Sequence, residues 1–196
     1  MSKNNDFIKT LVPGAIATYN KFKILPSITI AQAILESNWG RSSPQNNIFG
    51  IKANSRWKGK TQKLKTKEWD GEKMISVMAN FRAYDSIENS ILDHGILLTA
   101  LRYSAVRETT DYKAAAIALQ KAGYATDPNY AKKLISIIES YKLYEYDKKK
   151  LSAWDKEKAA AKKWVMENGI SDGSNPEEVA SREMIWVMLR RIGIKG

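Results

Sequence analysis

The hydrophobic residues of the chain are most concentrated at residues 28–35, where only Thr29 and Gln32 are polar. A segment that is apolar on nearly every side is typical of a helix buried in a protein core. Ser27 stands directly before this stretch as a predicted N-cap, and Gly40 predicts the end of the helix. The sequence therefore predicts one central buried helix in the first part of the chain.

Apolar residues at helical spacing predict further helices on both sides of this segment. They cover residues 6–22, 87–103, 112–122 and 128–143, and the last three follow the predicted caps Ser86, Asp111 and Asp127. In the helix at residues 87–103, Leu101 is expected to face inward. The prediction for this part of the chain is a mainly helical domain.

Residues 62–69 and 72–81 predict a β-hairpin inserted among these helices. They flank Asp70-Gly71, the strongest short-range signal for a two-residue turn. Alternation along the first strand puts Leu64, Thr66 and Glu68 on one face. The fold class predicted from the pattern is α+β, mainly α with a small β-hairpin lobe.

The lysines of residues 148–150 form the best candidate for a linker. They separate a predicted domain at residues 1–147 from a small helical C-terminal module at residues 151–196. The module has few apolar residues, too few for an independent core of its own. We therefore expect it to dock onto another surface or to form a homo-oligomer.

The composition limits the chemistry that the chain can perform. The sequence of 196 residues has no cysteine and a single histidine, His94. Disulfides and thiolate metal sites are excluded, and a histidine-based triad or zinc site is poorly supported. No metal or cofactor is expected, His94 is expected to be a buried structural residue, and carboxylates remain as the catalytic groups.

The net charge of +11 favours an anionic partner, such as a nucleic acid, an anionic membrane or an anionic cell-wall polymer. No nucleic-acid-binding motif accompanies the charge, and no apolar run is long enough to cross a bilayer. The N-terminus lacks the basic-then-apolar pattern of a signal peptide. We therefore expect a protein made in the cytoplasm, with no nucleic-acid partner and no membrane insertion.

Glu36 lies at the C-terminal end of the predicted buried helix. Removal from water and the negative end of the helix dipole both disfavour the charged carboxylate, so its pKa is expected to be raised. A carboxyl that stays protonated near neutral pH suits a general acid that protonates a glycosidic oxygen. The alternative interpretation is a buried ion pair of Glu36 with Arg41 or Arg82.

The loop at residues 40–59 and its border carry three aromatic residues, Trp39, Phe49 and Trp57. Aromatic side chains in a loop either anchor the loop on the core or form a stacking surface for flat ligands such as sugar rings. The residues alone do not distinguish the two roles.

Five motifs in order along residues 8–146 resemble the bacterial cell-wall glucosaminidases of glycoside hydrolase family 73, relatives of the flagellar peptidoglycan hydrolase and of phage and autolysin domains. The motifs are Leu35-Glu36-Ser37-Asn38-Trp39-Gly40, Asn47-Ile48-Phe49-Gly50-Ile51-Lys52, Thr66-Lys67-Glu68, Phe81-Arg82-Ala83-Tyr84-Asp85-Ser86 and Gly123-Tyr124-Ala125-Thr126-Asp127-Pro128-Asn129-Tyr130. The resemblance implies a lysozyme-like fold whose small β-lobe holds a second carboxylate.

The resemblance also implies roles for individual residues. Glu36 is the catalytic acid, and Glu68 of the Thr-x-Glu motif is the general base or stabilising carboxylate, with Asp70 and Glu72 as neighbouring candidates. Tyr124 matches a position that borders the catalytic Glu and positions the substrate or stabilises the transition state. The residues expected to line or brace the substrate groove are Trp39, Phe49 and Tyr130, and Trp57 is a further candidate from the loop.

Residues 164–173 and 181–183 resemble a single repeat of the S-layer homology type. This resemblance implies attachment to an anionic secondary cell-wall polymer, with Arg182 as the anion contact and Asp172 within the same repeat. Such modules usually carry three repeats, so either the protein oligomerises through its tail or the tail is only a docking element.

Together these features predict a peptidoglycan hydrolase that cuts the β-1,4 bond after N-acetylglucosamine by general acid catalysis. It is expected to reach the cell wall after release by a holin or as part of a phage particle. The enzymatic alternative is a muramidase or lytic transglycosylase on the same fold. The alternative from another class is a non-catalytic protein that binds the cell wall or a phage tail. A fully ion-paired Glu36 would favour this last alternative.

Overall fold

The computed structural model describes residues 3–69, 72–148, 164 and 166–167. The chain divides into one unit of residues 1–150 and another of residues 151–196. In the second unit the described residues are Trp164, Met166 and Glu167, all helical. The rest of the predicted S-layer-like repeat, with Arg182 and Asp172, lies outside the described residues, and the linker and domain boundaries stay predictions.

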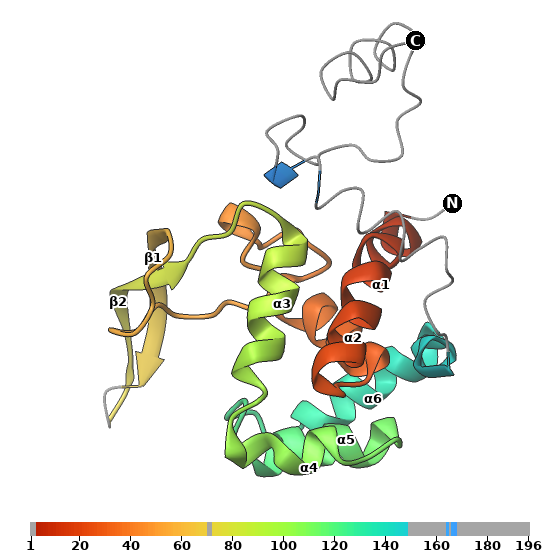
Figure 1. Cartoon of the computed structure of the whole chain (residues 1–196). Coiled ribbons are helices and arrows are strands. Elements are labelled where there is room, and N and C mark those ends of the chain that lie inside the picture. The colour runs from red at the N-terminus through yellow and green to blue at the C-terminus, as the bar shows by residue number, and fades with distance from the viewer. Residues whose placement is uncertain (1–2, 70–71, 149–163, 165, 168–196) are drawn as a thin grey trace, which may run out of the picture. The chain divides into compact units, whose positions relative to one another are not determined.

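The first unit is mainly helical, with one antiparallel hairpin, as predicted (Figure 1). Its α-helices are α1 (Lys3–Phe22), α2 (Pro26–Ser37), α3 (Ile87–Leu97), α4 (Ser104–Arg107), α5 (Tyr112–Lys121) and α6 (Tyr130–Ser140). Three short 3₁₀ segments are η1 (Pro44–Asn46), η2 (Leu101–Tyr103) and η3 (Leu143–Lys148), and the strands are β1 (Thr61–Trp69) and β2 (Met74–Arg82). Among the helices in the described part, none is both long and apolar enough to cross a bilayer.

Helix α2 is the centre of the core, as its hydrophobic pattern predicts. Ten of its twelve residues are buried, and it packs against α1, α5, α6 and η3. Figure 1 shows the other helices arranged around it, with the hairpin extending away beyond α3. A side chain that points outward from either end of α2 is therefore held on a rigid support.

The N-terminus of α2 is capped by a distant residue and not by Ser27, which corrects the prediction. Pro26 is the first helical residue, where the missing N–H costs nothing. The backbone N–H of Ser27 donates to Asp147 Oδ1 at 2.8 Å, and the Ser27 hydroxyl donates to Oδ2 at 2.7 Å. A carboxylate in this position satisfies a free N–H and complements the positive end of the helix dipole.

The C-terminus of α2 comes earlier than the predicted stop at Gly40. The helix ends at Ser37, because Asn38 adopts the left-handed conformation (φ 47°) as the C-cap. Trp39 and Gly40 are also left-handed, with φ of 62° and 74°. The two non-glycine residues, Asn38 and Trp39, store backbone strain two and three positions after Glu36, and such strain is concentrated at functional sites.

The predicted helix at residues 87–103 is divided into α3 and η2. Ala100 is extended (φ −56°, ψ 144°), and the Thr99 hydroxyl donates to the carbonyl oxygen of Ile96 at 2.7 Å, so the chain leaves the helix after Leu98. Leu98 is fully buried, whereas Leu101 is 86% exposed, and the inward orientation expected for Leu101 is wrong. The predicted caps Ser86 and Asp111 are confirmed, each accepting from a backbone N–H of the following turn.

The hairpin has a longer connection than the predicted two-residue turn. The register pairs Trp69 with Met74 and Thr61 with Arg82, so residues 70–73 connect the strands. A shift of two residues leaves Leu64 and Thr66 on their predicted face. Leu64 and Thr66 are half-buried, and the alternate residues Lys63 and Lys65 are exposed.

Candidate active site

Glu36 lies in the last turn of α2, where its side chain reaches solvent. The hydroxyl of Tyr130, the first residue of α6, donates a hydrogen bond to Glu36 Oε1 at 2.8 Å. Tyr130 is only 2% exposed, so this bond lies at the edge of the core. One carboxyl oxygen is thus held by the protein.

The pKa of Glu36 is raised above its ordinary value of 4.5, as the sequence predicts. The main cause is desolvation by the protein atoms around the carboxyl, which disfavours the charged form. The hydrogen bond from Tyr130 stabilises the carboxylate and lowers the pKa in part. Burial is the larger of the two effects, so the net shift is upward, which is the direction that suits a general acid.

Ion pairing does not neutralise Glu36 within the described residues. Arg82, one predicted partner, donates from Nη1 to Asp93 Oδ2 at 2.7 Å instead. Neither Arg82 nor Arg41 forms an ion pair with Glu36 in this part of the chain. The sequence offered no signal for the pairing of Arg82 with Asp93, because the two residues belong to different elements.

A chain of aromatic rings extends from Glu36 into the core. The Tyr124 ring stacks on the Tyr130 ring with centroids 5.6 Å apart and an interplanar angle of 24°. Burial, and next the charge of Glu36, raise the pKa of Tyr124 well above its ordinary value. Tyr124 therefore lies one ring away from Glu36 and keeps its phenolic proton as a hydrogen-bond donor.

His94 continues this chain and is a structural residue, as predicted. Its ring stacks on Phe49 at 3.8 Å and meets the edge of Tyr124 at 5.9 Å. His94 is fully buried, and burial lowers its pKa to about 3. Phe49 is 4% exposed, so it braces the site from inside and has no free face for a sugar ring.

The two remaining aromatic candidates are half-buried and held by protein contacts. Trp39 lies between Phe7 and Tyr141, with ring centroids 6.5 Å and 4.8 Å away. Trp57 donates from Nε1 to the Lys60 carbonyl oxygen at 2.9 Å, and the Arg82 guanidinium lies 4.6 Å from its ring centroid. Both anchor their segments, and each retains an accessible part.

Glu68 lies in β1, where the backbone register pairs it with Ile75. Its side chain and the whole of Asp70 lie outside the described residues, so the role of the second carboxylate stays a prediction. The hairpin that carries Glu68 is joined at its base to the loop after α2. The Asn47 amide donates to the carbonyl oxygens of Arg82 at 2.8 Å and Ile51 at 3.0 Å.

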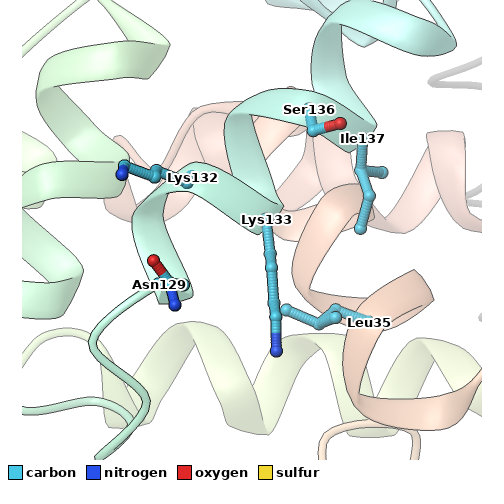
Figure 2. A pocket seen from close by; sticks show the side chains of 6 residues that line it. All are labelled: Leu35, Asn129, Lys132, Lys133, Ser136 and Ile137. Atoms are coloured by element: carbon cyan, nitrogen blue, oxygen red, sulfur yellow. The ribbon is translucent and has the colours of Figure 1, made fainter.

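An open hollow of about 520 Å³ lies between the end of α2 and α6. It is lined by Leu35, Asn129, Lys132, Lys133, Ser136 and Ile137 (Figure 2). Lys133 is paired with Asp127 at 2.6 Å. Two of the lining residues, Leu35 and Asn129, directly precede Glu36 and Tyr130 in the sequence. Neither Glu36 nor Tyr130 itself lines the hollow.

Comparisons with known proteins agree on one kind of domain. The model of the glucosaminidase family, described as mannosyl-glycoprotein endo-beta-N-acetylglucosaminidase, matches residues 12–143. The exo-glucosaminidase LytG of Bacillus subtilis is 45% identical over 150 residues, which are 72% of this chain and 52% of LytG. The peptidoglycan hydrolase FlgJ of Salmonella typhimurium is 38% identical over 147 residues, 71% of this chain and 46% of FlgJ. The chain thus spans about half the length of the curated relatives it matches.

Among solved structures, the catalytic domain of the autolysin Auto from Listeria monocytogenes superimposes with a TM-score of 0.67 and 38% identity. The superposition covers 75% of this chain and 89% of that domain. The two domains therefore share the same overall fold, which in this chain is mainly helical with a small two-stranded sheet.

Proposed function

The chain belongs to the glucosaminidase family, and on this premise we propose that it hydrolyses the β-1,4 glycosidic bond after N-acetylglucosamine in bacterial peptidoglycan. Glu36 is the general acid that protonates the leaving oxygen. The observation that carries this proposal is a solvent-reaching carboxyl with a raised pKa, held on the end of a buried helix by Tyr130. A raised pKa extends the pH range over which the carboxyl keeps a proton that it can deliver to a bound substrate.

The second half of the reaction needs a base or an anion on the opposite face of the sugar. We assign this role to Glu68, with Asp70 and Glu72 as the neighbouring alternatives. Tyr124, whose half-buried ring stacks on Tyr130, is assigned to bind the sugar or to stabilise developing charge through its phenolic proton. Accessible parts of Trp39 and Trp57 support a contribution to sugar binding, whereas Tyr130 and Phe49 support the site from inside.

The substrate is proposed from the names of relatives that act on the cell wall, among them the peptidoglycan hydrolase FlgJ. LytG is named an exo-glucosaminidase, so cutting from strand ends is the alternative to cutting within the strand. Residues 151–196, including Arg182 and Asp172, are proposed to bind an anionic secondary wall polymer, either as a docking module or as an oligomerisation module. Binding of purified sacculi before and after removal of that polymer tests this role.

The decisive experiment digests purified Gram-positive sacculi and identifies the reducing ends after borohydride reduction. N-acetylglucosaminitol ends support the proposal, muramitol ends indicate a muramidase, and 1,6-anhydro ends indicate a transglycosylase. Glu36→Gln is expected to lose nearly all activity, and Glu68→Gln most of it. The control Glu108→Gln changes an exposed glutamate outside the site and is expected to leave activity unchanged. Binding of sacculi by the wild type without cleavage would refute the enzymatic proposal.

A further inference from the structure

A continuous pair of hydrogen bonds links Glu36 to a residue deeper in α2. Gln32 Nε2 donates to the Tyr130 hydroxyl oxygen at 3.0 Å, and that hydroxyl donates to Glu36 Oε1 at 2.8 Å. Gln32 and Glu36 are four residues apart and share one face of the helix. Tyr130 of α6 therefore bridges two consecutive turns of α2.

The direction of these bonds follows from the orientation of the Gln32 amide, whose nitrogen faces the Tyr130 oxygen. An amide nitrogen can only donate, and a phenolic hydroxyl has a single proton. In the structure the Tyr130 oxygen accepts from Gln32, and its single proton is donated to Glu36 Oε1. A proton on Oε1 would face the Tyr130 proton across 2.8 Å, which is repulsive.

We propose that Gln32 is a positioning residue that acts through Tyr130 and keeps the catalytic proton of Glu36 on Oε2. This inference rests on the proposed role of Glu36 as general acid. Within the described residues, Oε2 has no hydrogen-bond partner, and the Glu36 side chain reaches solvent. The proton is therefore on the oxygen from which a substrate can take it.

Burial makes this arrangement persistent. Gln32 is fully buried and Tyr130 is 2% exposed, so water does not compete for their bond. Among the described residues, Tyr130 is the single side-chain hydrogen-bond partner of Gln32, because the Gln32 carbonyl oxygen is buried without one. An effect of the Gln32 amide on Glu36 must therefore pass through Tyr130.

The reverse orientation of the amide would have the opposite effect. If Gln32 accepted the Tyr130 proton, Glu36 would donate its own proton from Oε1 to Tyr130, away from the substrate. Among the described residues, the titratable groups that interact with Glu36 are Tyr130 from α6 and Tyr124 from the turn before it. Burial raises the pKa of both, so they stay neutral and leave the titration to Glu36.

The test removes each donor in turn with Gln32→Met, Tyr130→Phe and the double variant. The pH profile of kcat/KM on sacculi has a basic limb set by the pKa of Glu36 in the free enzyme. Loss of a hydrogen bond that favours the carboxylate raises the pKa of Glu36, so both single variants are expected to move the basic limb to higher pH. The expected shift is roughly 0.5–1 pH unit for Tyr130→Phe and smaller for Gln32→Met. We expect kcat of Gln32→Met to fall about tenfold with little change in KM.

The double variant separates positioning from simple packing. If Gln32 acts through Tyr130, the double variant has the kcat and basic limb of Tyr130→Phe alone. Thr29→Val is the matched control, because Thr29 is a buried polar residue of the same helix whose hydroxyl has no partner among the described residues. It is expected to leave the limb in place. The proposal is overturned if the basic limb of Gln32→Met stays at the wild-type pH. It is also overturned if Gln32→Met lowers kcat by the same factor in the Tyr130→Phe background as in the wild type.

A second readout does not depend on activity. The carboxyl ¹³C shift of Glu36, assigned by its absence from Glu36→Gln, gives the Glu36 pKa directly in protein labelled at glutamate. The same order of pKa values is expected: wild type lowest, Gln32→Met higher, Tyr130→Phe highest and equal to the double variant. If the wild type cuts no sacculi, the proposed function fails. The titration still decides whether Gln32 controls Glu36.

Discussion

Asp93 on α3 accepts a hydrogen bond from Arg82 at the end of β2, with Nη1 and Oδ2 2.7 Å apart. The Tyr84 hydroxyl donates to the same oxygen at 2.6 Å. Both charged side chains are only 14% exposed, so the pair is largely shielded from water. This contact joins the base of the hairpin to the helical core.

Asp93→Ala is expected to destabilise the fold by about 2–4 kcal/mol, because it leaves the shielded Arg82 guanidinium without its partner. Urea unfolding at pH 7 measures the loss. The control is Asp85→Ala, which removes an exposed pair with Lys60 whose side chains are 73% and 66% exposed. That change is expected to cost less than about 1 kcal/mol. Equal losses in the two variants would contradict the shielded character of the Arg82–Asp93 pair.

Glu36→Gln is expected to be more stable than the wild type at neutral pH while losing activity. Burial raises the pKa of Glu36 above its ordinary 4.5, so between pH 4.5 and the folded-state pKa the folded chain keeps a proton that the unfolded chain has released. Stability therefore falls as pH rises through this window, and glutamine removes that loss. Because the side chain reaches solvent, the gain is expected to stay below about 1 kcal/mol.

Thermal unfolding of both proteins across this pH range checks the prediction. The difference in Tm between wild type and Glu36→Gln should grow with pH. A wild type that is the more stable protein at neutral pH would show that the folded state favours the carboxylate.

His94→Phe is expected to make the fold less sensitive to acid. Burial lowers the pKa of His94 to about 3, so below its ordinary value of 6.5 the unfolded chain binds a proton that the folded chain excludes. The contribution of neutral His94 to the free energy of unfolding is complete above pH 6.5. It falls by about 1.4 kcal/mol per pH unit below that value. Phenylalanine does not titrate, and it can keep the stack on Phe49.

The comparison of urea midpoints at pH 7 and pH 4.5 tests this effect. The wild type should lose up to about 2.7 kcal/mol more than His94→Phe between the two values. Equal losses would mean that His94 is protonated in the folded chain.

Gly40→Ala is expected to destabilise the turn after Glu36 by about 2–4 kcal/mol. Gly40 has φ of 74°, and an added Cβ would lie 2.7 Å from the Phe7 ring. The left-handed conformation alone costs an alanine about 1–2 kcal/mol, and the steric conflict adds to it. Gly50→Ala is the matched control, because Gly50 has φ of 60° with nothing within 4 Å of the added atom. If the two variants lose equal stability in urea, the contact with Phe7 contributes nothing.

The sequence predicted those features that depend on neighbouring residues. The apolar run at residues 28–35 identified the central helix, and alternation with Asp70-Gly71 identified the hairpin and its faces. A single acidic residue at the end of the buried segment indicates Glu36 as the candidate acid. The raised pKa of Glu36 follows from the same local pattern.

The features that the sequence did not predict depend on contacts between distant residues. The replacement of Ser27 by Asp147 as the cap, the pairing of Arg82 with Asp93 and the bond of Gln32 to Tyr130 all join separate elements. Leu101 was misassigned because helical spacing continues in the sequence beyond Leu98, whereas the backbone turns at Ala100. Periodicity records which residues are apolar and does not record where a chain changes direction.

The bond between Ser27 and Asp147 has a consequence for synthesis on the ribosome, where the chain emerges from its N-terminus. The two residues are 120 positions apart, so the first turn of α2 leaves the ribosome long before its capping carboxylate exists outside the tunnel. Domains generally fold as units during translation, and here the last segment of the unit completes its most buried helix. Nascent chains that end before Asp147 therefore carry Glu36 on a helix whose N-terminus still lacks its cap.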